Sequence, residues 1–494
     1  MRYLSTRGGQ SATGAEAIVR GLARDGGLFV PESFPAVGAD ELALMANEPY
    51  AARAARILGR YLTDFTQEQL AGMVDSAYAR FDERGVAPLK ALEGGVRVIE
   101  LYHGPTLAFK DVALTLLPHL LTASARATGE AREVLILVAT SGDTGKAALS
   151  GFQDVPGTRC AVFYPEGGVS EAQRLQMVTQ RGDNTRVIAV KGNFDDAQTG
   201  VKRIFSDPRA AAAFDAKGLA LSSANSINWG RLAPQIVYYF SAYCDMLAAG
   251  DAAPGDKINI CVPTGNFGNI LAAYYAMRMG LPVHKLICAS NSNNVLTDFI
   301  RTGRYDARRA FHLTTSPSMD ILVSSNLERM LFELCGRDAA AVRGWMDGLR
   351  ENGCYEIGEN AKAALDALMY GAWASEAECA AEIARAWREE SYLVDPHTAV
   401  AMKALRDYRA ETGDTRPCTV ASTASPFKFG RAVSAALGLP TDADDFALCD
   451  RLAEKTGWAV PKAIAELPRL PVRHRAVCAP EDMLFTLMKE IDRP

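Results

Sequence analysis

Short apolar runs rich in β-branched residues alternate with helix-like segments along most of the chain. The apolar runs are 96–101, 134–139, 160–164, 185–190, 258–262, 285–289 and 418–421. Between them, segments such as 111–121, 171–179 and 270–279 have the apolar spacing of helices. Strands that alternate with helices predict parallel sheets covered by helices on both faces.

The two flanks of this alternating region have a different pattern. Residues 1–90 are mixed and mainly helix-like, with helical spacing at 39–45 and 67–81. Residues 326–390 are Ala-rich with charged faces and predict a helical insertion or subdomain. The sequence after residue 430 is too mixed to assign.

Composition and charge exclude several classes of protein. The balance of 48% hydrophobic and 22% charged residues is that of an ordinary globular protein. A net charge of −5 argues against nucleic-acid binding, which needs clustered Lys and Arg. None of the ten cysteines forms a CxxC pair and none of the six histidines forms an HxxxH pair, so no metal site is expected.

The amino-terminal sequence lacks the apolar segment of a signal peptide, and no apolar run reaches the roughly 20 residues of a membrane span. We therefore expect a cytoplasmic protein without membrane partners. The scattered cysteines fit a reducing compartment.

Three polar loops directly follow predicted strands, where ligands bind in open parallel sheets. The loop 264–269 (TGNFGN) opens a helix, and its glycines allow close approach of an anion, so it is a candidate phosphate cradle. A tight strand-to-helix turn is the alternative. The loop has neither the GxGxxG pattern nor a P-loop Gly-Lys-Ser/Thr, which disfavours NAD and ATP.

The other two loops are 140–145 (TSGDTG) and 422–426 (STASP). The first can hold a carboxylate, or it can be an ordinary cap in which Ser141, Asp143 or Thr144 satisfies the first-turn amides. The second can place a hydroxyl on a neutral ring nitrogen, or be a plain turn before Pro426.

Lys110 lies in HGPTLAFKD (103–111), after two apolar residues and an aromatic, and leads into an apolar helix. Burial lowers the pKa of an amine and makes it nucleophilic, as Schiff-base chemistry requires. The alternative is a lysine that reaches solvent from a helix start.

Four segments together resemble threonine synthase, of the long-chain type without a separate regulatory domain. HGPTLAFKD, TSGDTG, PTGNFGN and STASPFKF occur here in the order of that family. NSINWGR (225–231) and SPSMDILVSSNLER (316–329) also resemble it, and the resemblance extends from DGGLFVP (25–31) to about residue 430.

The resemblance implies a type II pyridoxal-phosphate (PLP) fold: two parallel-sheet α/β domains that face a cleft, plus a mainly helical N-terminal domain. We expect the N-terminal domain at 1–90 and the large PLP-binding domain at 91–125 and 215–494. Residues 126–214 are expected to form a smaller, mobile domain.

The resemblance also implies the roles of individual residues. Lys110 is implied to carry PLP as a Schiff base and to act as the catalytic base. The cofactor phosphate is assigned to Gly265, Asn266, Phe267 and Asn269, with Gly268 leaving room. Thr423 is implied to face the pyridine nitrogen. The substrate carboxylate is assigned to Ser141, Asp143 and Thr144.

The implied reaction converts O-phospho-L-homoserine and water to L-threonine and phosphate, the last step of threonine biosynthesis, by γ-elimination of phosphate and β-addition of water. Asn228, Arg231 and Lys428 are the candidates to hold the substrate phosphate, since an arginine suits a bidentate phosphate contact. The alternative is that each pairs with a nearby carboxylate on the surface. The substrate is the expected small-molecule partner, and the protein is expected to be a monomer or a homodimer.

Alternatives remain open at this point. A PLP phospho-lyase that releases phosphate and a 2-oxo acid from phosphohomoserine or phosphothreonine would share every motif. A nucleotide-binding oxidoreductase lacks its glycine fingerprint here. A catalytically silent binding protein is disfavoured by the presence of Lys110 and the phosphate loop.

Overall fold

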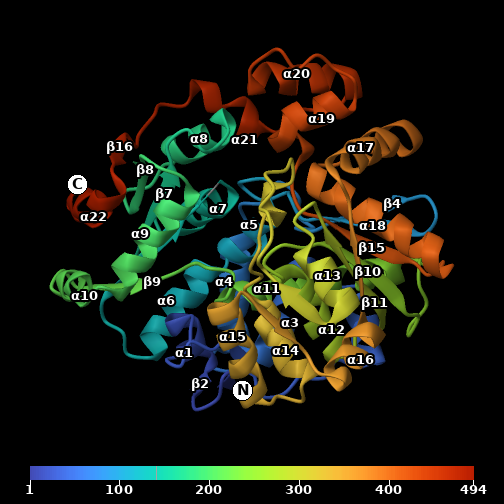
Figure 1. Cartoon of the computed structure of the whole chain (residues 1–494), viewed down its shortest axis with the longest axis horizontal. Coiled ribbons are helices and arrows are strands. Elements are labelled where there is room, and N and C mark those ends of the chain that lie inside the picture. Colours follow the sequence, from blue (N-terminus) through green and yellow to red (C-terminus); the bar gives the residue numbers. More distant parts are fainter. Residues whose placement is uncertain (141, 494) are drawn as a thin grey trace.

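The computed structural model describes residues 1–140 and 142–493. Two sheets lie on opposite sides of the molecule, each covered by helices (Figure 1). The α/β fold class with parallel sheets and a helical N-terminal region is confirmed.

The larger sheet has six strands in the order β14-β11-β10-β15-β5-β4. Their bounds are Met369–Trp373, Val283–Ser290, Ile258–Pro263, Cys418–Ser422, Val96–Glu100 and Leu89–Leu92. Neighbouring strands are parallel except β4, which runs antiparallel to β5 at the edge. The central strands β10 and β15 are fully buried, which explains why they read as continuous apolar runs.

The smaller sheet has five parallel strands in the order β16-β8-β7-β6-β9. Their bounds are Ala476–Cys478, Thr185–Val190, Thr158–Pro165, Glu133–Ala139 and Leu219–Ser222. The structure differs here from the expected domain boundaries, which place β9 and β16 in the large domain. Both strands extend the smaller sheet, and α22 (Met483–Ile491) packs its buried Met483 and Leu487 into the same core.

The N-terminal region consists of four helices and a small sheet. The helices are α1 (Gly14–Arg20), α2 (Ala39–Met45), α3 (Tyr50–Tyr61) and α4 (Gln67–Tyr78). The sheet is antiparallel, in the order β2-β1-β3, with bounds Ser11–Thr13, Arg2–Ser5 and Phe29–Pro31. The sequence pattern predicted a mainly helical region with helices at α2 and α4, but it did not single out α1, α3 or this sheet, whose strands are only three or four residues long.

The helix predicted at 111–121 is two helices, α5 (Lys110–Leu114) and α6 (Leu117–Ala127). Pro118 lies in the first turn of α6. Its ring would clash with the carbonyl of Leu114 in a continuous helix, so the chain breaks between the two.

The remaining helices cover the two sheets (Figure 1). On the smaller sheet they are α7 (Asp143–Phe152), α8 (Glu171–Val178), α9 (Phe194–Ser206) and α10 (Pro208–Asp215). On the larger side they are α11 (Trp229–Ala249), α12 (Gly268–Arg278), α13 (Val295–Thr302) and α18 (Pro396–Thr412). Towards the C-terminus follow α19 (Gly430–Ala436), α20 (Asp445–Thr456) and α21 (Lys462–Ala465).

The segment 326–390 is mainly helical, as predicted, but it also contributes two strands. Its helices are α14 (Leu327–Leu334), α15 (Ala339–Asn352), α16 (Glu359–Leu368) and α17 (Glu376–Glu390). Strand β13 (Cys354–Glu356) pairs with β12 (Arg304–Asp306), and β14 forms an edge of the larger sheet. The segment is therefore integrated into the larger sheet.

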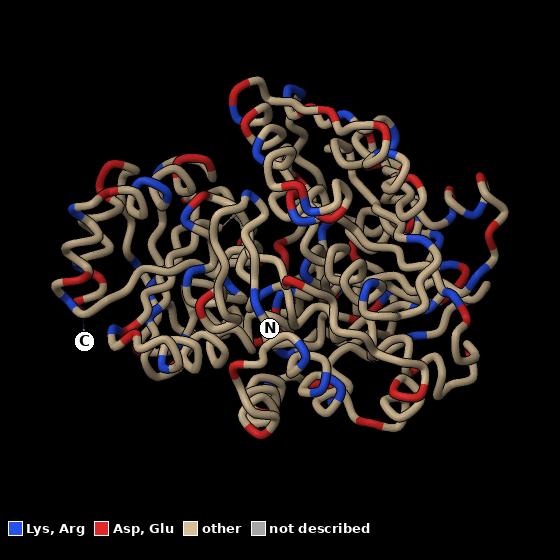
Figure 2. Tube along the Cα trace, turned by 90° about the horizontal axis from the view of Figure 1, so that it is seen from below, with Lys and Arg blue, Asp and Glu red and all other residues tan. Residues whose placement is uncertain are grey.

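Basic and acidic residues are interspersed over the trace, without a broad region of one sign (Figure 2). In the described part of the chain, no helix is long and apolar enough to cross a membrane. All ten cysteines are free, and eight of them are buried.

Candidate active site

The loop before Lys110 is tied to the loop after β15. An isolated antiparallel bridge joins Ala108 to Ala424. The Phe109 N–H donates to the Thr423 carbonyl at 2.8 Å, and the Ser425 N–H donates to the Leu107 carbonyl at 3.1 Å. The structure therefore brings two of the predicted site loops together at the carboxyl ends of β5 and β15.

Lys110 begins α5 and is largely buried, with 11% of its side chain exposed. Its Nζ donates to Ser318 Oγ at 2.9 Å and lies 3.7 Å from Asp143 Oδ2. Burial lowers the pKa of Lys110 to about 8, assisted by Lys428 and Arg231 and opposed by Asp143. An amine with this pKa is partly neutral near physiological pH, as a nucleophile or general base requires.

Asp143 also forms a buried ion pair with Lys428. Lys428 Nζ donates to Asp143 Oδ1 at 2.6 Å and to the Thr106 carbonyl at 2.9 Å. Burial alone would raise the pKa of Asp143, but the ammonium groups of Lys428 and Lys110 outweigh it and hold this pKa below its ordinary value. The carboxylate thus links α7, on the smaller sheet, to two lysines from other segments.

The loop between β10 and α12 has the features of an anion cradle. Phe267 adopts φ +63° and provides no side-chain cap for α12. The N–H groups of Gly268, Asn269 and Ile270 open the helix and have no acceptor among the described residues. The Asn269 amide nitrogen is buried and also lacks a partner there, while its oxygen accepts from Tyr238 and Tyr239.

A second segment closes over this loop. A Cβ on Gly265 would lie 2.5 Å from the Ser318 carbonyl oxygen, so only glycine fits. Ser324 Oγ donates to the Gly265 carbonyl at 2.7 Å, and the Asn326 N–H donates to the Asn266 carbonyl at 3.1 Å. Both carbonyls are thereby turned to partners behind the loop, which leaves its amides free for an anion.

At the start of α7, Thr140 acts as a cap that the sequence interpretation did not name. Thr140 Oγ1 accepts from the Gly142 and Gly145 N–H groups at 3.0 Å each, and among the described residues neither Asp143 nor Thr144 bonds a first-turn amide through its side chain. Ser141 lies outside the described residues. Gly142 adopts φ +146°, and a Cβ there would lie 2.5 Å from Gln173, so the turn requires glycine at this position.

Arg231 lies in the first turn of the buried helix α11, with 6% of its surface exposed. It donates to the Ala224 carbonyl at 2.8 Å and has no carboxylate within salt-bridge distance among the described residues. Burial lowers the pKa of Arg231 to about 10. A buried guanidinium of this kind is suited to an external anion.

Asn228 is the N-cap of α11. Its side-chain oxygen accepts from the Gly230 N–H, and its nitrogen donates to the Ile18 carbonyl, both at 2.9 Å. Both ends of the side chain are occupied within the protein, which favours a capping role. A phosphate contact by Asn228 stays a prediction.

Thr423 is 5% exposed, and its hydroxyl has no partner among the hydrogen bonds of the described residues. It lies next to the Lys110 loop through the contacts given above. An unpaired hydroxyl at this position can accept or donate to a ring nitrogen.

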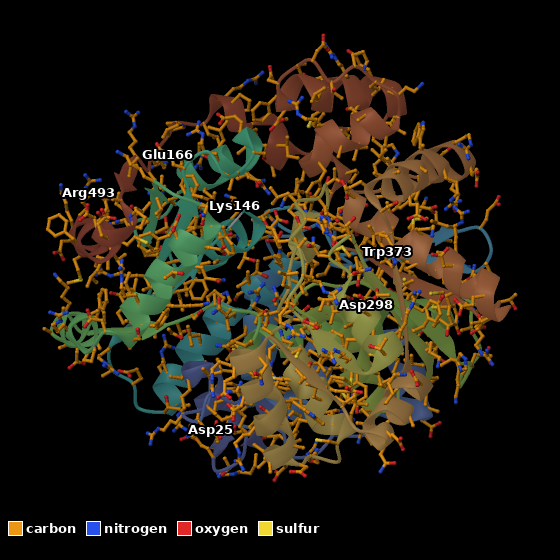
Figure 3. All side chains as sticks on the ribbon, viewed as in Figure 1. Asp25, Lys146, Glu166, Asp298, Trp373 and Arg493 are labelled. Atoms are coloured by element: carbon orange, nitrogen blue, oxygen red, sulfur yellow. The ribbon has the colours of Figure 1, made fainter. Side chains whose placement is uncertain are left out.

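Sequence reasoning missed Ser318 and His397 next to Lys110, and also Lys146. Ser318 contacts the amine directly, and its N–H donates to His397 Nε2 at 3.2 Å. Lys146 (labelled in Figure 3) lies on α7, which packs against α5, and donates to Gln180 Oε1 at 2.7 Å. Burial lowers the pKa of Lys146 to about 8. For Lys146, its place in the first turn of an apolar helix was a signal that the sequence offered. Ser318, a serine in a turn, gives no such signal.

The site thus combines a buried amine of lowered pKa, an anion cradle at a helix start and an unpaired hydroxyl. These groups fit pyridoxal phosphate, which needs a lysine for its aldehyde and free amides for its phosphate. The model of pyridoxal-phosphate dependent enzymes matches residues 87–423. The fold and the site therefore define a PLP-dependent enzyme of fold type II, and its cofactor is PLP.

Two further family models flank this match: the threonine synthase N terminus at residues 2–78 and the threonine synthase C-terminal model at 398–477. Threonine synthase of Pseudomonas aeruginosa is 41% identical over 438 residues, which cover 88% of this chain and 90% of that protein. The chain belongs to the threonine synthase family of PLP-dependent enzymes.

Solved structures agree with this assignment. PLP-bound threonine synthase from Brucella melitensis matches with a TM-score of 0.90 and 37% identity over 100% of both chains. Yeast threonine synthase matches with a TM-score of 0.89 and 30% identity over 99% of this chain and 98% of that one. Human threonine synthase-like 1 is 42% identical over 86% of this chain, which spans 58% of that protein's length.

Proposed function

We propose that the protein converts O-phospho-L-homoserine and water to L-threonine and phosphate, as the last step of threonine biosynthesis. The observation that carries this proposal is Arg231, a buried guanidinium without a carboxylate partner among the described residues, close enough to Lys110 to lower its pKa. A buried cationic group near the reacting amine suits a substrate with a phosphate leaving group. The relatives named threonine synthase support the same reaction.

Lys110 is proposed to hold the cofactor and to move protons on the substrate. When bound, PLP supplies a ring that delocalises negative charge from the substrate carbons. The Lys110 amine takes a proton at Nζ from the α-carbon, because its lowered pKa leaves a fraction of it neutral. The resulting ammonium has to release this proton before Nζ can accept another from the β-carbon. Asp143 lies close enough to Nζ to hold it in place during these transfers.

The cofactor phosphate is proposed to lie on the loop Gly265–Asn269, with the amides at the start of α12 as donors. The free Asn269 amide nitrogen adds a donor beneath the cradle. Thr423 is proposed to face the pyridine nitrogen, since its hydroxyl is not engaged within the described residues. A neutral partner at that nitrogen suits elimination and replacement chemistry.

The substrate phosphate is proposed to bind Arg231 and Lys428, with Asn228 as a further candidate. An ammonium has three donors, and Asp143 and Thr106 occupy two on Lys428. One donor of Lys428 is therefore left for a phosphate oxygen.

The substrate carboxylate is proposed to bind the start of α7, with Ser141 and Thr144. The Asp143 side chain is itself anionic and paired with two lysines. Asp143 therefore contributes through its backbone N–H and by fixing Lys110 and Lys428. We also propose that the smaller domain, with β9 and β16 added to residues 126–214, moves to close on the substrate.

Product analysis tests the proposed reaction. The purified, PLP-loaded protein is given O-phosphohomoserine, and phosphate, threonine and 2-oxobutyrate are quantified. We expect equal amounts of phosphate and threonine. Phosphate with 2-oxobutyrate and no threonine would instead establish the phospho-lyase.

Arg231→Gln separates substrate binding from the rest of the site. Removing a bidentate charge contact is expected to raise KM for phosphohomoserine by at least about tenfold. Arg209→Gln, at a guanidinium with 94% side-chain exposure, is the matched control and is expected to change nothing. Equal KM values in both variants would remove Arg231 from the proposal.

We further infer a cytoplasmic location and a monomeric or homodimeric state, with the small-molecule substrate as the partner. Cell fractionation tests the location. Light scattering of the purified chain gives the oligomeric state directly, and a mass above that of two chains would contradict the inference.

A further inference from the structure

The hydrogen-bond partner of the Lys110 amine is a serine to which the proposed reaction gives no role. Ser318 lies in the 3-10 turn Pro317–Met319, far from Lys110 in sequence. Its Oγ accepts from Lys110 Nζ at 2.9 Å, closer than the 3.7 Å between Nζ and Asp143 Oδ2. Ser318 is therefore the shortest polar contact of the reacting amine among the described residues.

Two buried residues fix the backbone of Ser318. The Ser318 N–H donates to His397 Nε2 at 3.2 Å, and His397 Nδ1 lies 2.6 Å from Asp395 Oδ2. Because Nε2 accepts a hydrogen bond, the ring proton is on Nδ1 and is donated to Asp395. His397 is 2% exposed and Asp395 is fully buried, so this chain of contacts is shielded from water.

Asp395 is itself held by the start of α18. It is the N-cap of this helix and accepts from the His397 and Thr398 N–H groups at 3.0 and 3.2 Å. The carboxylate thereby orients the imidazole from a rigid element. On its other side the Ser318 turn lies against the phosphate cradle, because its carbonyl oxygen occupies the space of a Cβ on Gly265.

We propose that Ser318 is a positioning residue for Lys110, held in register by the Asp395–His397 pair. Its hydroxyl orients Nζ and stabilises the ammonium form, while His397 keeps the hydroxyl at the required place. The proposal rests on the proposed function of Lys110 as the cofactor lysine and proton carrier. It adds Ser318, His397 and Asp395 to the residues that determine the protonation state of that amine.

The charges around Lys110 determine the direction of the expected effect. Asp143 on α7 favours the ammonium, whereas Lys428 and Arg231 disfavour it, as does burial. A hydroxyl oxygen that accepts from Nζ also favours the ammonium, because a charge-assisted hydrogen bond is stronger than a neutral one. Removing the hydroxyl is therefore expected to increase the fraction of neutral amine.

The test measures the protonation of Lys110 directly in the full chain after removal of PLP. Lys110 is acetylated with limiting acetic anhydride from pH 6 to 10, and its modification is quantified by mass spectrometry. In Ser318→Ala we expect the labelling of Lys110 at pH 7 to rise about three- to fivefold, which corresponds to a pKa lower by about half a unit to one unit.

A matched control separates the hydroxyl from the turn. Ser316→Ala removes a buried hydroxyl two residues earlier, which bonds Asn291 at 3.0 Å and not Lys110. It is expected to leave the Lys110 labelling profile unchanged. An equal shift in both serine variants would mean that the turn is merely distorted, and would overturn the assignment.

Variants of His397 test whether His397 acts on Lys110 through Ser318. His397→Leu leaves the Ser318 N–H without an acceptor and is expected to reproduce the Ser318→Ala profile, whereas His397→Gln keeps an acceptor and is expected to restore it. The double variant Ser318→Ala/His397→Leu should equal Ser318→Ala alone, because His397 acts through Ser318. Additive shifts would contradict the proposal.

The outcome is independent of the substrate. An unchanged profile in Ser318→Ala, in a protein that still forms threonine, would overturn the positioning role and leave the proposed function intact. A shifted profile in Ser318→Ala, together with a wild type that forms no threonine from O-phosphohomoserine, would overturn the proposed reaction and leave the positioning of Lys110 by Ser318 intact. Thermal unfolding of each variant confirms that the profiles compare folded proteins.

Discussion

At the scale of single residues, the site is a set of buried charges balanced against each other. Lys110 and Lys428 share Asp143, and Arg231 is left without a carboxylate among the described residues. The desolvation of these groups lowers the free energy of unfolding, and the binding of anionic ligands raises it again. The cofactor and the substrate are therefore expected to stabilise the protein as well as react in it.

The lowered pKa of Lys110 gives a stability prediction for the cofactor-free protein. Its pKa is about 8 in the folded chain, against 10.5 as the ordinary value. Between these values the unfolded chain binds more protons, so the free energy of unfolding rises with pH. Below pH 8 the buried ammonium of Lys110 lowers the free energy of unfolding by its full amount, up to about 3 kcal/mol.

Denaturant unfolding at several pH values measures this effect. From pH 7 to 10 the wild type is expected to gain stability relative to Lys110→Met, since methionine has no proton to lose. Lys257→Met, at an exposed lysine, should run parallel to the wild type. A constant difference between wild type and Lys110→Met over this range would contradict the lowered pKa.

Gly265 gives a second residue-scale prediction. A Cβ there would lie 2.5 Å from the Ser318 carbonyl, whereas a Cβ on Gly344 of α15 meets no atom within 4 Å. Gly265→Ala is expected to weaken PLP binding by at least about tenfold, through displacement of the cradle. Equilibrium dialysis of PLP against both variants checks this, and an unaltered Kd in Gly265→Ala would argue against the cradle.

At the scale of elements, helix starts create the binding groups. The starts of α7, α11 and α12 each contribute groups to the site: the amides next to Asp143, the guanidinium of Arg231 and the cradle at Gly268. Their dipoles favour negative charge, which suits a substrate with a carboxylate and a phosphate. The chain turns back after β6 to begin α7 and after β10 to begin α12. The starts of these two helices and of α11 therefore face the same region.

Thr140 is the residue that shapes the start of α7. Thr140→Val removes the acceptor of the Gly142 and Gly145 N–H groups and is expected to cost about 1 to 2 kcal/mol. It should also raise KM, because the loop proposed to hold the substrate carboxylate loses its shape. Urea unfolding and steady-state kinetics measure the two effects.

Thr66→Val is the control for this change. Thr66 caps α4 in a capping box in the N-terminal region. It is expected to lower stability by a similar amount and to leave KM unchanged. An equal rise of KM in both variants would attribute the effect to stability alone.

The elements around the site could be predicted because the central strands are buried runs with loops at their ends. Strands β8 and β10 begin at the predicted residues, and α2 has the predicted bounds. The sequence did not predict strands β9 and β16, because strands of three or four residues are too short to show a periodic pattern of apolar residues. Likewise Ser318 meets Lys110, and His397 meets Ser318, only through tertiary packing, which a local pattern does not encode.

At the scale of the whole molecule, the two sheets are joined at several places along the chain. The C-terminal segment returns across α8 to add β16 to the edge of β8, with α22 behind it (Figure 1). The smaller sheet is thus completed by residues distant in sequence. Motion of this half has to carry the C-terminal segment with it.

Leu487 tests this arrangement. It is fully buried in the core of the smaller sheet, and Leu487→Ala is expected to cost about 2 to 5 kcal/mol. Phe485, on the same helix, is 74% exposed, and Phe485→Ala is expected to change stability by less than about 0.5 kcal/mol. Equal unfolding midpoints for the two variants would show that α22 does not complete this core.

The central claim is that Lys110 carries PLP in an enzyme acting on phosphohomoserine, and one measurement tests it most directly. The absorbance spectrum of the purified protein is recorded beside that of Lys110→Ala, before and after addition of O-phosphohomoserine. We predict a visible band of lysine-bound PLP in the wild type that is absent from the variant, and a change of that band with substrate as phosphate and threonine appear together. A wild-type protein that stays colourless after addition of PLP would contradict the account.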